Sequence, residues 1–240
     1  MADGQPGGTG DWTGFYVGGN LGGAWTSDDI KWVANPAGFG AGPFTAALNA
    51  GGTGHLDPAG VTVGGQLGYN HQLGNSIVLG IEADFSYTDL TEGRIAAVAP
   101  PAVAGTVATS TFESKWLATI RARMGIQATP TVLLYGTGGV AFAEVQTSDF
   151  AVFPFDGSIN ASSSDRTRTG WTVGGGAEWA WMPNWSVKAE YLFLDFGSVS
   201  ETSTNTVVPI ATIRHDHDIT ASVARIGLNY RFSGGDGFRH

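Results

Sequence analysis

Apolar and polar side chains alternate along Ile77-Val78-Leu79-Gly80-Ile81-Glu82-Ala83-Asp84-Phe85-Ser86-Tyr87. Successive side chains of a β-strand point to opposite faces. One face of this stretch therefore carries isoleucine, leucine and aromatic residues, whereas the other carries glycine, serine and the carboxylates Glu82 and Asp84. This pattern predicts a strand that separates an apolar environment from a polar one.

The same alternation recurs along the chain between prolines, which cannot donate to a sheet ladder and so mark turns and loops. It predicts eight strands, at about 13–26, 60–72, 76–88, 111–127, 131–146, 169–181, 185–197 and 217–232. Both faces of segment 131–146 are apolar, so its orientation stays open.

The connections between these strands alternate in length. Short ones lie near Leu73–Asn75, Ala128–Pro130 and Met182–Asn184, and long ones cover about 27–59, 89–110, 147–168 and 198–216. Tight periplasmic turns and long extracellular loops are typical of outer-membrane barrels. The prediction is an all-β fold, an eight-stranded antiparallel up-and-down transmembrane β-barrel. Its parts would be a periplasmic N-terminal segment (1–11), the barrel with four long extracellular loops (12–232) and a C-terminal tail (233–240).

The composition limits the other classes. Only 14% of the 240 residues are charged, 37 are glycine and none is cysteine, and the net charge is −9. No apolar run reaches the ~18 residues of a spanning helix, a thiol nucleophile is excluded, and nucleic-acid binding would need a basic face. Residues 1–4 carry no basic and apolar signal segment, so the chain is expected to be the mature form of an exported protein.

A two-faced barrel is either a soluble barrel with an apolar core, as in lipocalins, or a membrane barrel with an apolar outer face. The polar faces contain much glycine, threonine, serine and asparagine and little charge, which favours a narrow lumen over a surface in water. Aromatic residues also gather near both strand ends and predict two interfacial girdles. These residues are Trp12, Trp181, Trp185, Tyr230 and Phe232 at the short-turn end, and Trp25, Tyr87 and Trp171 at the other.

Strand parity places charged residues in the lumen. The predicted set is Glu82, Asp84, Glu113, Lys115, Arg121, Arg123, Glu178, Lys188, Glu190, Arg225 and Arg231. An eight-stranded barrel is only wide enough for its own side chains, so these charges should pair in a salt-bridge network that plugs the lumen. The rival interpretation is a catalytic carboxylate pair, Glu82 with Asp84 or Glu178 with Glu190. Nearby arginines disfavour it because they would keep both acids ionised.

His215 and the run Asp216-His217-Asp218 lie where the last long loop is expected to meet the last strand. His215 and His217 are weak candidates for metal ligands, and a solvated loop is the favoured interpretation. No metal and no other cofactor are expected.

Several strands carry a family resemblance. The motifs are Trp12-Thr13-Gly14-Phe15-Tyr16-Val17-Gly18-Gly19-Asn20-Leu21-Gly22, Leu79-Gly80-Ile81-Glu82-Ala83-Asp84-Phe85, Leu134-Tyr135-Gly136-Thr137-Gly138-Gly139-Val140, Trp185-Ser186-Val187-Lys188-Ala189-Glu190-Tyr191 and Arg225-Ile226-Gly227-Leu228-Asn229-Tyr230-Arg231-Phe232. They resemble the alphaproteobacterial outer-membrane immunogenic proteins, also called surface-antigen porin-like proteins. The resemblance implies a fold like the membrane domain of OmpA, exposure at the cell surface and a role in envelope integrity. Some relatives are described as porins and others as haem binders, and no catalytic residue comes with the resemblance. Family members usually end on the aromatic of the last strand, whereas here Phe232 is followed by eight residues.

The leading functional prediction is a structural, surface-exposed barrel of the bacterial outer membrane that is not an enzyme. A small-solute porin, a soluble ligand-binding barrel, and a loop-based binder of haem or metal through His55, His215 and His217 are the alternatives. Expected partners are outer-membrane lipid and lipopolysaccharide, the barrel-assembly machinery, and a surface ligand or an envelope protein. Nucleic acid is not among them.

Overall fold

The computed structural model describes residues 10–74, 76–98 and 105–232. Most of the expected N-terminal segment and the whole C-terminal tail lie outside these residues. The strands are β1 (Gly14–Ala34), β2 (Gly54–Leu56), β3 (Ala59–Leu73), β4 (Ile77–Val98), β5 (Thr106–Thr129), β6 (Val132–Phe153), β7 (Ser158–Met182), β8 (Trp185–Asn205) and β9 (Thr212–Arg231). Two helices, α1 (Pro36–Phe39) and α2 (Pro43–Gly52), lie between β1 and β2. No helix among the described residues is long and apolar enough to cross a membrane.

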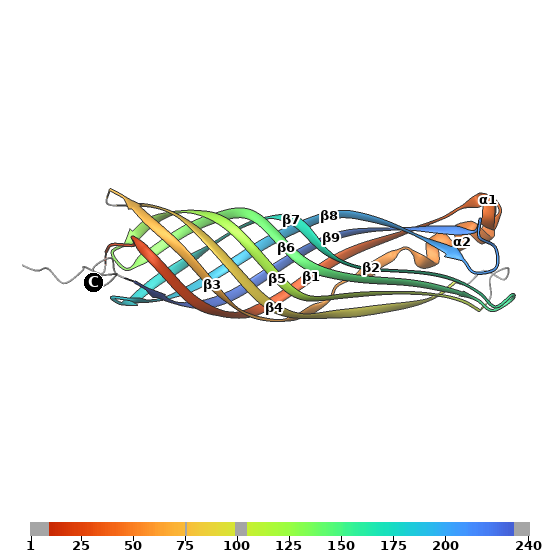
Figure 1. Cartoon of the computed structure of the whole chain (residues 1–240), viewed down its shortest axis with the longest axis horizontal. Coiled ribbons are helices and arrows are strands. Elements are labelled where there is room, and N and C mark those ends of the chain that lie inside the picture. Colours follow the sequence, from red (N-terminus) through yellow and green to blue (C-terminus); the bar gives the residue numbers. More distant parts are fainter. Residues whose placement is uncertain (1–9, 75, 99–104, 233–240) are drawn as a thin grey trace, which may run out of the picture.

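Eight of the strands close into a ring. The sheet runs in the order β1-β3-β4-β5-β6-β7-β8-β9, every neighbour is antiparallel, and β9 pairs back onto β1 from Tyr16–Arg231 to Ala34–Ile213. The short β2 pairs only with Asp28–Ile30 of β1. The predicted all-β barrel is therefore confirmed, with β2 as a ninth strand that the sequence pattern did not reveal. β1 begins and β9 ends at the end opposite the helices (Figure 1).

We call the two ends of the barrel the turn end and the distal end. The turn end holds the short connections Leu73–Ile77, Thr129–Val132 and Met182–Trp185, where short turns were predicted, and the distal end holds α1 and α2. The predicted long loops are mostly wrong, because β4 to β9 continue through much of 89–110, 147–168 and 198–216 as strand. Among the connections that lie wholly within the described residues, only the one between β1 and β3 is long, and it holds both helices and β2.

The outer face of the barrel carries an apolar belt between two groups of aromatic residues. Outward residues of the belt include Leu21, Val61, Val63, Leu67, Ile81, Ile120, Met124, Val173 and Ile226, all at least 49% exposed. At the turn end Phe15 packs on Tyr69 and Tyr230 on Trp185 and Phe232, and towards the distal end Trp25 packs on Tyr191, Phe85 on Trp116 and Trp171 on Phe193. An apolar outer face between aromatic girdles is the pattern of a barrel in lipid and excludes the soluble lipocalin-like alternative.

The pattern inverts beyond Trp25. The next outward residues of β1 are Ser27, Asp29 and Lys31, whereas the inward Ile30 and Trp32 are at most 2% exposed. They join a distal core of buried apolar residues that includes Leu90, Phe112, Val145, Leu192, Leu194 and Ile213. Apolar side chains inside and polar ones outside are what a barrel needs in water. The strands therefore leave the lipid at the level of Trp25 and continue in water. For this reason they extend beyond the predicted strand ends.

The orientation of β6, which the sequence left open, is now settled. Leu133 and Tyr135 point inwards and are at most 7% exposed, whereas Leu134 and Val140 point outwards at 44% and 42%. Both faces are apolar because the inward Leu133 packs with Trp12, Val78 and Ala180 near the turn end, and the inward Val145 belongs to the distal core.

Adjacent glycines of β6 provide a stability test of the narrow lumen. A Cβ at Gly139 would lie 2.0 Å from the carbonyl oxygen of Ile120, whereas one at Gly138 would lie no closer than 3.5 Å to the Thr172 carbonyl oxygen. Overpacking costs roughly 1–3 kcal/mol. We therefore expect Gly139→Ala to lower the free energy of unfolding by about that amount and Gly138→Ala to leave it unchanged or slightly raised. Urea unfolding in detergent micelles, followed by tryptophan fluorescence, measures both. Equal stability of the two variants would contradict the close approach at Gly139.

Candidate functional site: a charged network in the lumen

Eight of the eleven predicted lumen charges meet in one cross-section of the barrel. They are Glu82 and Asp84 of β4, Arg121 and Arg123 of β5, Glu178 of β7, Lys188 and Glu190 of β8, and Arg225 of β9. None is more than 6% exposed. We call these residues the lumen network. Its four acids and four bases balance in formal charge.

Arg121 lies at the centre of the lumen network. Its Nη2 is 2.9 Å from Asp84 Oδ2 and also contacts Glu82, and its Nη1 is 3.0 Å from Glu190 Oε1. The Nε donates to Thr119 Oγ1. One guanidinium therefore connects carboxylates of β4 and β8, two strands that are far apart in the sequence.

Arg225 and Lys188 complete the pairing of the same three acids. Arg225 donates through Nη1 and Nη2 to the two oxygens of Asp84, at 2.9 and 3.1 Å, and its Nη2 lies 2.7 Å from Glu190 Oε2. Lys188 Nζ is 2.7 and 2.8 Å from the two oxygens of Glu82. Two-pronged, charge-assisted hydrogen bonds of this kind are the strong ones in proteins.

A second group of contacts extends the lumen network towards the turn end. Arg123 Nη2 is 2.8 Å from Glu178 Oε2, and its guanidinium lies 4.0 Å from the ring centre of Tyr135. The hydroxyl of Tyr135 donates to Glu190, and that of Tyr16 donates to Glu82. Sequence reasoning missed both tyrosines. Tyr16 alternates with the outward Phe15 and Val17, so parity could have found it, whereas Tyr135 belongs to the strand that parity could not orient.

Three of the predicted lumen charges lie elsewhere, and these placements correct the prediction. Glu113 and Lys115 pair with each other at 3.1 Å, with side chains 38% and 49% exposed. A bulge in β5 between Glu113 and Leu117 shifts the register and reverses which face each residue takes. Arg231 is at the turn-end rim, where it donates to the Pro183 carbonyl oxygen instead of to a carboxylate.

Trp12 also differs from its prediction as a girdle residue. It is 2% exposed and packs with Val78, Leu133 and Ala180 in an apolar cluster under the lumen network. The guanidinium of Arg231 lies 5.5 Å from its ring. A large aromatic side chain therefore occupies the turn end of the lumen.

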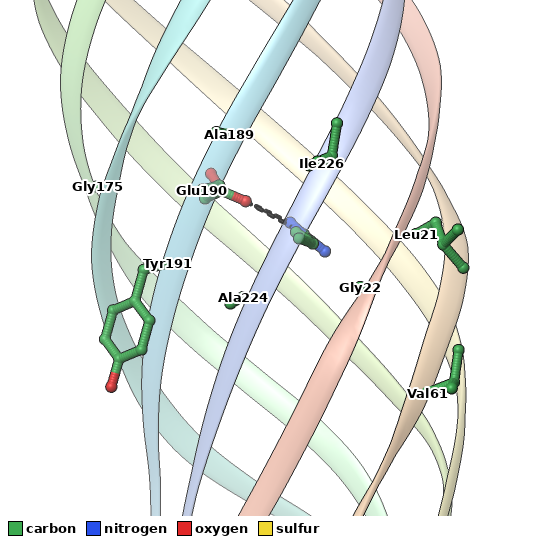
Figure 2. A pocket seen from close by; sticks show the side chains of 10 residues that line it. Leu21, Gly22, Val61, Gly175, Ala189, Glu190, Tyr191, Ala224 and Ile226 are labelled. Atoms are coloured by element: carbon green, nitrogen blue, oxygen red, sulfur yellow. Dashed lines mark hydrogen bonds and ion pairs between the residues drawn. The ribbon is translucent and has the colours of Figure 1, made fainter.

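The wall of the barrel separates the lumen network from the lipid-facing surface. In Figure 2 the side chains of Leu21, Val61 and Tyr191 stand on the outer face, whereas Glu190 points to the inside and reaches its ion-pair partner there. The outer residues line an open groove of about 820 Å³ over β8, β9 and β1. Glu190 and Arg225 also belong to the lining of this groove, but they are at most 5% exposed and pair with each other on the inner side of the wall.

A second buried group of ionisable side chains lies in the distal core, beyond the belt. His217 Nδ1 is 2.9 Å from Asp28 Oδ2, and its Nε2 is 3.0 Å from Asp149 Oδ2. Burial by itself would lower the pKa of His217, but the hydrogen bonds and charges of both aspartates outweigh it and raise this pKa to about 10. His217 is therefore a cation at neutral pH and joins β9, β1 and β6 across the barrel.

We call Asp28, Asp149, His215 and His217 the distal cluster. Asp149 accepts a hydrogen bond from Ser110, and although burial opposes it, the contact with His217 keeps the pKa of Asp149 below its ordinary value. His215 contacts Ser203 through Nε2 and packs edge-on against Trp32. Burial lowers the pKa of His215, so this histidine is neutral at pH 7.

The histidines are not placed as the sequence predicted. His215 and His217 lie within β9, face the interior and are each 1% exposed, so a solvated loop there is wrong. His55 of β2 is exposed, and Asp29 and Asp57 flank it, each at 2.8 Å. Within the described ranges, no group of three or more histidine, aspartate or glutamate side chains has the arrangement to hold a metal ion.

The chain is similar in sequence to known outer-membrane proteins. Residues 4–232 match the family described as the outer membrane protein beta-barrel domain. The chain is 37% identical over 223 residues to the 31 kDa outer-membrane immunogenic protein of Brucella melitensis, which covers 92% of this chain and 84% of that relative. It is 30% identical over 193 residues to the 22 kDa outer membrane protein of Rhizobium leguminosarum, covering 79% and 66% respectively. Among solved structures, the outer membrane protein OprG from Pseudomonas aeruginosa is similar with a TM-score of 0.49 and 13% identity, over 94% of this chain and 99% of that one.

Proposed function

Because the chain belongs to the family of outer membrane protein β-barrel domains, we propose that it is a sealed barrel with a structural, surface-exposed role in the cell envelope. The chain is an outer-membrane protein, as its relatives are. The finer proposal is that its lumen conducts neither ions nor small solutes, and that the distal half stands on the extracellular side.

The lumen network is the observation that carries this proposal. Eight charged side chains from five strands fill one cross-section, and none is more than 6% exposed. A water path would have to separate these ion pairs, and each charge left without its partner would cost several kcal/mol. The near-complete pairing therefore favours a closed lumen.

Two further layers support closure. The apolar cluster around Trp12 lies on the turn side of the network, and the distal core around Leu192 and Leu194 lies on the other, each of these leucines being 0% exposed. Apolar layers present no ligands for a hydrated ion, so passage would require both layers as well as the network to rearrange.

The proposal includes no catalytic role. Each of the four carboxylates of the lumen network contacts at least one arginine or lysine within 3 Å. Such pairing engages the carboxylate oxygens, whereas general acid–base catalysis needs a group that is free to exchange its proton with a substrate. A haem or metal ligand at the cell surface could use His55, but the burial of His215 and His217 removes them from that role.

The expected partners of a sealed barrel follow from its outer surface. Lipid chains and the lipid part of lipopolysaccharide would contact the apolar belt, and the aromatic girdles would lie at the two interfaces. Assembly into the membrane would use the barrel-assembly machinery that serves outer-membrane barrels in general.

Conductance tests the proposal. We expect the purified protein in planar lipid bilayers to give no reproducible single-channel steps, because the lumen network and the apolar layers block the path. Heat-modifiable migration on a denaturing gel should show that the same sample is folded, and a general porin recorded under the same conditions is the positive control. Stable steps of uniform size from the folded sample would refute the sealed lumen and favour the small-solute porin.

A further inference from the structure

The wall of the barrel is interrupted between β7 and β8, beyond the apolar belt. Among the described residues, ladder pairs join these strands at Asn160–Asn205 and Ala161–Thr204 and resume only at Trp171–Asp195. Residues 162–170 and 196–203 lie between these points, and we call them the seam. At ~3.3 Å per residue this is about 30 Å of strand on the β7 side.

Both strands of the seam are otherwise held in place. β7 pairs continuously with β6 through the whole stretch, and β8 pairs with β9 from Ser198 to Thr204. Each strand thus offers one edge whose backbone groups have no ladder partner. Such an edge is a template for pairing with another extended chain.

The seam is open to water and polar. The alternation of burial is lost at Asp165, Arg166 and Thr167, all three of which are exposed. A cavity of about 490 Å³ lies here, and its lining includes Ser162, Arg166, Arg168, Ser200, Glu201 and Thr202. The Nε of Arg168 and the Oγ of Ser162 are buried without a hydrogen-bond partner among the described residues. The seam therefore combines free edges with unused side-chain donors.

We propose that the seam is a docking slot for an extended acidic peptide segment of another protein, which adds to the free edge of β7 or β8 as a strand. Backbone hydrogen bonds to the edge would supply the binding, and Arg166 and Arg168 would select carboxylate side chains. Edge addition is a common mode of peptide recognition.

The charged side chains that line the cavity favour an acidic occupant, although the seam as a whole carries Asp165 and Glu201 against Arg166 and Arg168. Two guanidinium groups line the cavity against one carboxylate, Glu201, and the contact between Arg168 and Glu201 is long at 4.0 Å. The chain as a whole has a net charge of −9, so this pair of arginines is a local exception. The proposal does not depend on the sealed lumen, since the seam lies outside the belt and above the lumen network.

Paired cysteines test whether the seam is open, and the absence of native cysteine makes the experiment clean. Extending the ladder from Ala161–Thr204 would place residue 164 opposite residue 201. We expect the Ser164→Cys/Glu201→Cys variant to form no rapid disulfide in the folded protein, because an open seam holds these positions apart. The Asn160→Cys/Asn205→Cys variant, at a pair that the ladder does join, is the control and should cross-link. Rapid cross-linking of both variants would show a closed wall and overturn the proposal.

Peptide binding tests the occupant. The probe is a fluorescent seven-residue peptide that alternates glutamate with threonine and valine, and anisotropy is measured with the full chain in detergent micelles. We expect binding that weakens at least tenfold for Arg166→Ser/Arg168→Ser, and at least tenfold when alternate peptide nitrogens are methylated, because methylation removes the edge donors. The control Lys31→Ser/Arg214→Ser removes the same charge from the exposed surface of β1 and β9 and should leave binding unchanged.

Three outcomes would overturn the docking slot. The first is absence of binding to the wild-type chain. The second is equal weakening by the seam variant and the control variant, which would indicate attraction to overall charge. The third is unchanged binding of the methylated peptide together with displacement by a sulfated polysaccharide, which would indicate an anionic-glycan site instead of strand addition.

Discussion

The Arg121→Met variant is expected to unfold with a free energy about 3–5 kcal/mol lower than that of the wild type, because a buried ion network then loses one partner. Arg121 contacts Glu82, Asp84 and Glu190 with a side chain that is 0% exposed. Methionine fills much of the same volume but leaves four acids against three bases in the lumen. The remaining bases Lys188 and Arg225 contact the same acids. The loss of stability should therefore be smaller than the loss from breaking three isolated ion pairs.

Urea unfolding in detergent micelles, read by heat-modifiable migration and by tryptophan fluorescence, measures this change. Lys115→Met is the matched control, because Lys115 also pairs with a glutamate but is exposed to solvent, and exposed pairs contribute little. A double variant, Arg121→Met/Glu190→Gln, restores an equal number of acids and bases and should recover part of the lost stability. The lumen network would be energetically unimportant if Arg121→Met proved as stable as Lys115→Met.

Period-two alternation predicted the membrane half of this protein well, because the environment there changes sharply across the wall. Each belt strand has lipid on one side and a crowded lumen on the other, so residues such as Ile81 and Glu82 reveal their faces directly. The same contrast identified most of the lumen network. What parity cannot supply is which acid meets which base, since this depends on the stagger between strands. Arg121 and Glu190, for example, are 69 residues apart.

Most of the failures have one of two physical causes. A single extra residue in β5 reverses the faces, so Glu113 and Lys115 were assigned to the lumen although their side chains are exposed. Beyond Trp25 the strands pass from lipid to water and the polarity of the two faces inverts. A prediction that expects apolar residues on the outer face then assigns the continuing strand to a loop. His215 and His217 were misplaced for this second reason.

The inversion also explains why the distal cluster is the least expected part of the molecule. Its charges are buried in a region that is otherwise an apolar core, where an unpaired charge is costly. His217 is the only cation that contacts both Asp28 and Asp149 among the described residues. The stability of the distal half should therefore depend on this one imidazolium more than on any other single charge there.

The His217→Gln variant is expected to lose about 3–5 kcal/mol of unfolding free energy near pH 6, where removal of the cation leaves two buried carboxylates without compensation. The pKa of His217 is raised from 6.5 to about 10 in the folded chain. A raised pKa stabilises the fold fully below the unfolded value of 6.5, and this contribution is lost as the pH rises through 10. The difference between wild type and variant should therefore be largest near pH 6 and shrink steadily towards pH 10, while His215, Asp28, Asp149 and Ser110 remain in both chains. His55→Gln, which removes an exposed histidine that also pairs with aspartates, is the control and should change stability little at any pH. A wild-type advantage that stays constant from pH 6 to pH 10 would mean that His217 acts through packing and not through its charge.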